Sequence, residues 1–191
     1  MTETRCELLI VDDEPLVLSA LQRALRRSFG ARVQVTVTPS AAEALRWVAE
    51  RPFAAVISDL RMPEMDGLTL LALTAALQPH AALLLLTGSA DFAVAQRAVN
   101  QVGVFRYLTK PWQDDELLVH LQAALEHSEA SRRRADQADA WAREQGQLSA
   151  QDAERRRLEA IEPGITQVEW GPQGEVLMPA LESRERERHG R

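Results

Sequence analysis

Three carboxylates stand at the ends of two apolar runs, and they are the first candidates for chemistry in this chain. Asp12 and Asp13 follow the run 8–11, and Asp59 follows the run 54–58. If the two runs are neighbouring parallel strands, their carboxyl ends deliver these side chains to one edge of a sheet, where α/β ligand sites form. Carboxylates gathered in this way repel one another, so the cluster would need a divalent cation.

A lysine and a threonine are the next candidates. The chain has 22 basic residues, of which Lys110 is the one lysine and the other 21 are arginine. Lys110 ends a further apolar run and precedes Pro111, and its compact ammonium is suited to pairing with a phosphate oxygen. Thr87 lies between the run 83–86 and Gly88, and it adds a hydroxyl donor.

Composition restricts the class of protein. The 191 residues suffice for one domain with an appendage. The net charge of −6 argues against non-specific nucleic-acid binding, and no apolar run approaches the roughly 20 residues that span a bilayer. One cysteine allows no internal disulfide, and residues 1–5 do not begin a secretory signal. We therefore expect a cytoplasmic protein that binds neither nucleic acid nor membrane.

Short apolar runs alternate with helical patterns along the first two thirds of the chain, which is typical of consecutive βαβ units. We predict strands near 7–12, 32–37, 54–59, 82–87 and 104–109. We predict helices that start at Pro15, after a Ser40 cap, at Gly67, at Asp91 and at Gln113 or Asp114. Five such strands predict a flavodoxin-like doubly wound parallel sheet of order 2-1-3-4-5, in which strands one and three are neighbours.

Five separated motifs carry a resemblance to a known family. They are Val11-Asp12-Asp13-Glu14, Asp59 with Met62-Pro63 and Asp66-Gly67, Thr87-Gly88, Tyr107, and Lys110-Pro111. With these motifs, residues 6 to about 126 resemble the receiver domain of bacterial two-component response regulators, of a stand-alone CheY-like type with a C-terminal helical extension. The resemblance covers about two thirds of the chain.

The resemblance implies a phosphorylation site. Asp59 would be the phosphoacceptor, and Lys110 and Thr87 would contact the phosphoryl group. Asp13, Asp59 and the backbone carbonyl of Arg61 would bind Mg²⁺ directly, with Asp12 acting through water. The residues by themselves leave another role open for Asp12 and Asp13, which is to cap the helix that starts at Pro15.

The resemblance also implies partners and a conformational switch. A histidine kinase or a histidine phosphotransfer protein would supply the phosphoryl group. Thr87 and Tyr107 would be the switch pair, the ring following the hydroxyl inward after phosphorylation. The family has the bond between Lys110 and Pro111 in cis. The chain would not be an enzyme, beyond its own phosphoryl transfer and dephosphorylation.

The chain after the receiver-like part predicts a long helix. Residues 114–161 contain no proline and are interrupted only by Gly146. One set of positions repeats there at heptad spacing, and small and polar residues fill most of it: Leu121, Ala124, Ser128, Ser131, Ala135, Ala138, Ala142 and Gln145. For this extension, 127–162, two alternatives stay open: a parallel coiled-coil homodimer, or a solvated helix frayed around Gly146. Residues 163–180 predict a β-hairpin, and residues 181–191 a flexible tail.

Three functions are compatible with these observations. The favoured hypothesis is a phosphorylation-controlled binding module whose output partner is unknown. The alternative is a regulator or adaptor of a separate enzyme, such as one in cyclic-di-GMP signalling, because residues 104–112 are similar to receivers fused to phosphodiesterases of that pathway. A DNA-binding transcription regulator is less favoured, since residues 127–191 show neither a helix-turn-helix nor a basic face.

Overall fold

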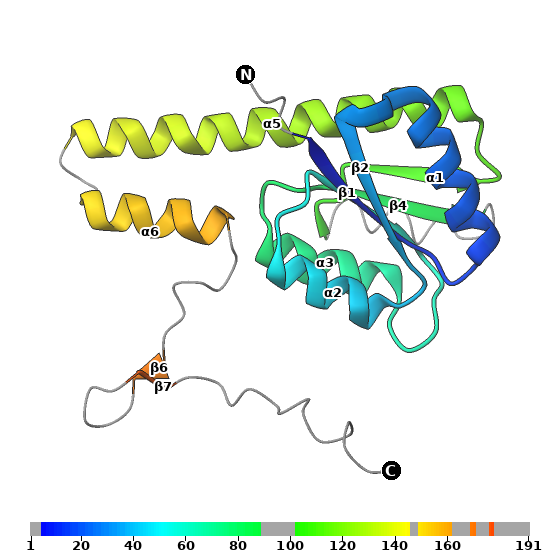
Figure 1. Cartoon of the computed structure of the whole chain (residues 1–191), viewed down its shortest axis with the longest axis horizontal. Helices are drawn as coiled ribbons and strands as arrows, with labels where there is room; N and C mark the ends of the chain where they lie inside the picture. The colour runs from blue at the N-terminus through cyan, green and yellow to red at the C-terminus, as the bar shows by residue number, and fades with distance from the viewer. Residues whose placement is uncertain (1–4, 89–101, 146–148, 162–168, 171–175, 178–191) are drawn as a thin grey trace, which may run out of the picture.

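A parallel five-stranded sheet forms the centre of the molecule (Figure 1). The computed structural model describes residues 5–88, 102–145, 149–161, 169–170 and 176–177. The strands are β1 (Cys6–Val11), β2 (Val33–Thr38), β3 (Ala55–Asp59), β4 (Ala82–Gly88) and β5 (Arg106–Lys110). Their order is β2-β1-β3-β4-β5 and all four pairings are parallel, which confirms the predicted flavodoxin-like sheet.

Helices cover both faces of the sheet. They are α1 (Pro15–Phe29), followed by a 3-10 turn (Gly30–Arg32), then α2 (Ala41–Glu50), α3 (Gly67–Leu77) and α5 (Asp114–Glu144). Apolar side chains of α1 and α5 form one core cluster with one face of the sheet, and those of α2 and α3 form a second cluster on the other face. The predicted fourth helix, Asp91 to about Val102, lies outside the described residues except at its end.

The strand register fixes where polar side chains leave the sheet. Val11 pairs with Ser58, and Asp59 pairs with Leu86 on β4. The next residue after Val11 is Asp12, so the carboxylates of two neighbouring strands leave the sheet at the same edge. β3 is buried along its whole length because helices cover both of its faces, as continuous apolar runs require.

Two of the helices start at side-chain caps, and the sequence predicts the first of them, Ser40. The Ser40 hydroxyl accepts a hydrogen bond from the backbone N–H of Glu43 at 3.3 Å, at the start of α2. The Asp66 carboxylate accepts one from the backbone N–H of Thr69 at 2.7 Å, at the start of α3. Each cap satisfies a backbone donor that the first helical turn leaves unpaired.

The long helix predicted over 114–161 is wrong as a single helix. The structure has two: α5 ends at Glu144, and α6 (Ala150–Ile161) lies alongside the far part of α5 (Figure 1). An ion pair between Asp139 Oδ1 and Arg156 Nη1, at 2.7 Å, joins the two helices. Gly146 lies between them, and glycine is a poor residue for a helix interior.

The first four positions of the predicted heptad pattern pack against the rest of this protein. Leu121, Ala124 and Ser128 are buried, the first two within the core cluster that contains α1. The Ser131 hydroxyl lies 2.9 Å from His80 Nδ1. These four positions therefore face the protein's own sheet and loops, not a partner helix, and a coiled coil through the remaining positions stays a prediction.

Further contacts fix α5 at the edge of the sheet opposite the carboxylates. The Arg132 guanidinium donates to the Phe53 carbonyl at 2.9 Å. The rings of Phe105 and His127 lie with centroids 4.8 Å apart. The predicted boundary between residues 126 and 127 thus falls inside a continuous helix that stays attached to the sheet as far as Arg132.

Little of the C-terminal part is described. β6 (Glu169–Trp170) and β7 (Val176–Leu177) pair antiparallel within the predicted hairpin 163–180. The rest of that segment and the predicted tail 181–191 lie outside the described residues, so both stay predictions. Among the helices that are described, none combines the length and apolar character needed to cross a membrane.

Candidate functional site

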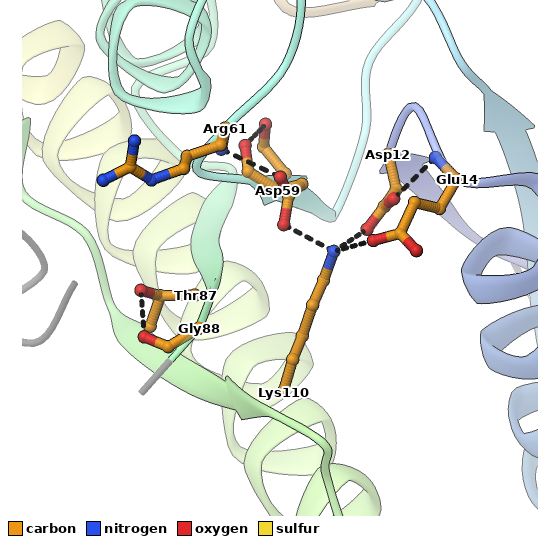
Figure 2. Close-up of polar contacts among 8 residues, drawn as sticks. Asp12, Glu14, Asp59, Arg61, Thr87, Gly88 and Lys110 are labelled. Atoms are coloured by element: carbon orange, nitrogen blue, oxygen red, sulfur yellow. Dashed lines mark hydrogen bonds and ion pairs between the residues drawn. The ribbon is translucent and has the colours of Figure 1, made fainter. Parts of the chain in front are cut away.

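The carboxyl ends of β1, β3 and β5 meet at a cluster of one ammonium and three carboxylates (Figure 2). Lys110 Nζ lies 2.6 Å from Asp59 Oδ1 and 2.7 Å from Asp12 Oδ2. It lies 3.4 Å from Glu14 Oε1. The structure therefore brings together Asp12, Asp59 and Lys110, as the sequence predicts, and adds Glu14.

A backbone turn after β3 holds the Asp59 side chain. Its Oδ2 accepts a hydrogen bond from the backbone N–H of Arg61 at 2.8 Å, while Oδ1 faces Lys110. The backbone N–H of Leu60 donates to the Leu86 carbonyl at 2.8 Å. Asp59 is 6% exposed, so one carboxylate oxygen is fixed by the main chain and the other is offered to the cluster.

Gly67 belongs to one of the sequence motifs, but the sequence does not show why this position must be a glycine. A Cβ atom at this position would lie 1.9 Å from the carbonyl oxygen of Asp59 and 2.8 Å from Ser58 Oγ. Its backbone N–H donates to the Leu60 carbonyl at 3.0 Å. Only glycine allows α3 to start directly against the backbone of Asp59. The signal in the sequence is a glycine directly after an N-cap aspartate.

Burial and the neighbouring charges shift the pKa values of two groups in the cluster, Asp12 and Lys110. Burial raises the pKa of Asp12, and the hydrogen bonds from Lys110 and from the backbone of Glu14 oppose that rise. Burial lowers the pKa of Lys110, but its hydrogen bonds to Asp12 and Asp59 outweigh this and leave its pKa raised. Lys110 therefore stays an ammonium at neutral pH, surrounded by more negative than positive charge.

Asp12 does not cap α1. The N-cap residue is Glu14, without a side-chain cap, so this alternative for Asp12 and Asp13 is wrong. Asp12 Oδ1 instead accepts from the backbone N–H of Glu14 at 2.9 Å and thereby holds the turn that presents Glu14 to Lys110. Asp13 is exposed, and among the described residues it makes no hydrogen bond or ion pair with the cluster.

Thr87 and Tyr107 lie on β4 and β5, two strands that end beside the cluster. The Thr87 side chain is buried, and its hydroxyl donates to the Gly88 carbonyl at 3.1 Å (Figure 2). Tyr107 is half-buried and packs against the core cluster of α2 and α3. The peptide bond between Lys110 and Pro111 is cis, as the resemblance implies.

The oxygen donors of the cluster suit a small hard cation. Asp12 Oδ2 is buried and has no hydrogen-bond partner apart from its ion pair with Lys110. Carboxylate and carbonyl oxygens are the ligands that Mg²⁺ prefers. Within the described residues no three His, Cys, Asp or Glu side chains are already arranged as a metal site, and the carboxylates close around the ammonium instead. The chemistry of the donors thus fits Mg²⁺, while their positions would have to change.

Comparison with known proteins identifies the family of this domain. Residues 8–122 match the model of the response regulator receiver domain. The chain is similar to the transcriptional regulatory protein GlrR of Escherichia coli (strain K12), at 38% identity over 128 residues, which are 67% of this chain and 28% of that protein. It is 35% identical over 118 residues to the DNA-binding transcriptional regulator NtrC of the same organism, covering 62% of this chain and 24% of NtrC. The chain therefore spans only about a quarter of the length of these relatives.

Solved structures agree with the family match. A signal receiver domain of an HD domain-containing protein from Pseudomonas fluorescens Pf-5 is 38% identical with a TM-score of 0.63, over 68% of this chain and 93% of that one. An adenylate cyclase structure from Rhodopirellula baltica is 30% identical with a TM-score of 0.65, over 71% and 98%. Because the family model matches more than half of its residues, the chain belongs to the response regulator receiver domain family.

Proposed function

We propose that Asp59 accepts a phosphoryl group from a phosphohistidine of a histidine kinase or a histidine phosphotransfer protein. The observation that carries this proposal is the position of the Lys110 ammonium, 2.6 Å from Asp59 Oδ1 at the edge where the strands end. Asp59 Oδ1 attacks phosphorus, the phosphorus–nitrogen bond breaks, and the histidine imidazole leaves. A nucleophile beside a fixed cation is what phosphoryl transfer requires of a protein.

The residues of the cluster have different roles in the phosphoryl transfer. The backbone N–H of Arg61 holds Asp59 Oδ2, so that Oδ1 is the attacking oxygen. Lys110 moves from pairing with the free carboxylate to pairing with an oxygen of the transferred group, which carries more charge. Asp12 and Glu14 keep the ammonium in place before transfer.

Mg²⁺ is the cofactor of this proposal, held by Asp13, Asp59 and the backbone carbonyl of Arg61, with Asp12 acting through water. When bound, the ion neutralises charge on the phosphoryl oxygens. The exposed Asp13 side chain would turn toward Asp59, and Asp12 Oδ2, which pairs with Lys110 in this structure, would gain a second partner.

Thr87 and Tyr107 form the proposed switch. Phosphorylation gives the Thr87 hydroxyl a charged acceptor in place of the Gly88 carbonyl that it contacts in this structure. Tyr107 follows into the space that Thr87 leaves. The changed surface then alters a contact with an output partner, so the chain acts by binding, in the cytoplasm, and not as an enzyme on other substrates.

A second candidate is a regulator of a separate output enzyme, such as one in cyclic-di-GMP signalling. It is favoured by the similarity to the receiver of an HD domain-containing protein. GlrR and NtrC are transcription regulators. A DNA-binding role is nevertheless the weakest candidate, because residues 127–191 show neither a helix-turn-helix pattern nor a basic face.

The test is phosphorylation of the whole chain by a small phosphodonor such as acetyl phosphate with Mg²⁺, followed by intact-protein mass spectrometry. We expect one added phosphoryl group on the wild type and none on Asp59→Asn. Asp66→Asn is the matched control, since Asp66 is a carboxylate of the same turn that caps α3 and lies outside the cluster. Labelling of Asp59→Asn at the wild-type level, or loss of labelling in Asp66→Asn alone, would contradict the assignment of Asp59.

A further inference from the structure

A cavity of about 350 Å³ opens at the amino edge of the sheet, away from the carboxylate cluster. It lies between the end of α3, the starts of β4 and β5, and α5, and its walls include Ala75, Leu83, Val102, Phe105 and His127. The rings of Phe105 and His127 stand together in this wall, with centroids 4.8 Å apart. The volume is at the lower end of the range of about 300–1,000 Å³ that is typical of ligand pockets.

The polar groups of this wall already have partners inside the protein. Gln78 lines the cavity, but its side chain is held by the backbone groups of Phe53, Val48 and Arg51. Backbone N–H groups of the wall also donate hydrogen bonds within the domain, namely those of Ala81, Ala82 and Phe105. The cavity therefore offers mainly apolar surface, which suits an apolar side chain better than a charged ligand.

A row of α5 residues leads from the cavity to α6. The row has four-residue spacing, so that successive members are neighbours on the helix surface, and consists of His127, Ser131, Ala135 and Asp139. His127 lines the cavity, and the Ser131 hydroxyl contacts His80, which directly follows the wall residue Pro79. Asp139 pairs with Arg156 of α6. α6 runs antiparallel to α5 (Figure 1), so its end returns along α5 toward the cavity.

The chain after α6 is long enough to reach the cavity. From Arg156, α6 continues for about 7 Å to Ile161, which brings its end level with about Arg134 of α5. His127 lies about 10 Å further along α5, and packed helices are about 8–10 Å apart, so the cavity is within about 15 Å of Ile161. Seven residues, 162–168, connect Ile161 to β6 and can span up to about 23–25 Å. The β6–β7 hairpin can therefore reach the cavity without a movement of α5 or α6.

The hairpin itself needs a surface to pack on. Figure 1 shows it clear of the sheet, and a two-stranded hairpin is only marginally stable by itself in water. Trp170 lies directly opposite Val176 in the antiparallel register, and residues in such a pair share one face of the hairpin. A tryptophan side chain can bury about 150–250 Å², so Trp170 is the residue whose burial would stabilise the hairpin most.

We propose that the β6–β7 hairpin docks on this cavity of its own chain, with the Trp170 indole beside Phe105 and His127. Aromatic rings attract one another in offset and edge-to-face arrangements, which the two rings of the wall offer. The short connection to α6 gives the hairpin an effective concentration of about millimolar at the cavity, so it outcompetes a free apolar partner.

The docked hairpin does not involve Asp59 or Lys110, which lie at the other edge of the sheet. The proposal is therefore independent of the phosphorylation chemistry: the hairpin docks without a phosphodonor, and it docks in Asp59→Asn as in the wild type. It also ties the end of α6 to the domain, so that α6 is held at both of its ends.

The test is fluorine NMR of the whole chain, with its 4 tryptophans replaced by 5-fluorotryptophan and a soluble gadolinium complex as the probe of exposure. The Trp170 resonance is identified by its loss in Trp170→Phe. We expect the gadolinium complex to broaden the Trp170 resonance much less than that of Trp141, which is 58% exposed. This protection stays constant on dilution, because the contact lies within one chain.

A variant that fills the cavity removes the protection. Ala75 is a half-buried residue of the wall, and in Ala75→Phe the added ring takes up the space of the indole. We expect Trp170 in this variant to be broadened as strongly as Trp141. The matched control is Ala76→Phe, the same change at the next residue of α3, which is exposed and does not line the cavity. Trp170 stays protected in the control.

A reciprocal measurement leaves the cavity intact and decides the proposal even if Ala75→Phe does not fold. Trp170→Leu removes the indole ring current, so we expect the ring-proton signals of His127 to shift, whereas Trp141→Leu leaves them in place. The proposal is overturned by a wild-type Trp170 as accessible as Trp141, by protection that persists in folded Ala75→Phe or is lost in Ala76→Phe, or by His127 signals that Trp170→Leu does not move. Protection that falls on dilution also overturns it, since the hairpin would then dock on a second copy.

Discussion

The two edges of the central sheet are held by different kinds of contact. At the carboxyl edge, Asp12, Asp59 and Lys110 form an ion-pair cluster with more carboxylates than cations. At the opposite edge, Gln78 and Arg132 make hydrogen bonds to backbone groups. An ion pair between Arg51 Nη1 and Glu7 Oε2 at this edge is long, at 3.8 Å. Ion pairs can exchange one anion for another, whereas a buried backbone group without a partner costs about 1–3 kcal/mol. The first edge can therefore respond to a phosphoryl group, and the second keeps the scaffold fixed.

Gln78 is the strongest test of the fixed edge. Its side-chain carbonyl accepts from the Phe53 N–H at 2.8 Å, and its amide donates to the carbonyls of Val48 at 2.6 Å and Arg51 at 2.7 Å. Gln78→Ala leaves these groups without partners, so we expect about 3 kcal/mol lower free energy of unfolding in urea.

A matched control for Gln78 is available on α5. Gln122 is exposed and bonds only Glu126, at 2.7 Å, among the described residues. Gln122→Ala should change the free energy of unfolding by less than about 0.5 kcal/mol. Equal costs at the two positions would remove the distinction between a structural edge and an ordinary surface.

A substitution at Gly67 tests the carboxyl edge of the sheet by adding volume without changing a charge. Gly67→Ala places a methyl group against the Asp59 carbonyl, so β3 and α3 must separate at the phosphoacceptor. We expect a loss of about 1–3 kcal/mol in stability and at least a tenfold slower phosphorylation by acetyl phosphate.

Gly30→Ala separates the two effects at Gly67. Gly30 has a φ of 55°, but no atom lies within 4 Å of an added Cβ. This change should cost about 1 kcal/mol through backbone strain and leave the phosphorylation rate of the folded protein unchanged. Wild-type phosphorylation of Gly67→Ala would show that Asp59 tolerates the displacement.

Arg132 gives a smaller effect at the fixed edge. Arg132→Ala removes one hydrogen bond from an exposed guanidinium to the carbonyl of the buried Phe53, so we expect about 1 kcal/mol lower stability in urea. Arg134→Ala, an exposed arginine of the same helix, should be neutral. If Arg132→Ala leaves the free energy of unfolding unchanged, Ser131 and the core residues of α5 suffice to hold the helix against the sheet.

Asp12 gives an effect of the opposite sign that depends on pH. Because burial raises the pKa of Asp12 above its ordinary value of 3.8, its charge opposes folding above the folded-state pKa, and this penalty vanishes as the pH falls below 3.8. Asp12→Asn should therefore be slightly more stable than the wild type at pH 7, and the difference should disappear in acid. The net effect is small, since the ion pair with Lys110 offsets burial. A less stable variant at pH 7 would mean that the ion pair outweighs burial.

The sequence predicts the site well where strand ends determine it. Asp12, Asp59 and Lys110 directly follow or end apolar runs, and parallel strands bring such ends to one edge. It predicts less where a side chain has two directions available: Asp13 is adjacent to Asp12 yet exposed. It does not predict the role of Gly67, because the closeness of α3 to the Asp59 carbonyl depends on how the helix packs and not on a local pattern.

The helical extension shows the same limit. The heptad pattern correctly marks Leu121, Ala124 and Ser128 as one face of a helix, but periodicity does not identify what covers that face. The receiver's own sheet does so. Gly146 was the only interruption visible in the sequence, and the two helices on either side of it gain an ion pair by lying alongside each other.

The length of α5 has a mechanical consequence. The helix is continuous from Asp114 to Glu144, and among the described residues the last hydrogen bond that joins it to the sheet and its loops comes from Arg132. The part beyond extends about 20 Å, since a helix rises about 1.5 Å per residue. A tilt of only a few degrees where α5 meets the sheet would move the end of the helix by about 1–2 Å. The extension is thus a lever, which converts a small displacement at the receiver into a larger one at α6 and Trp141.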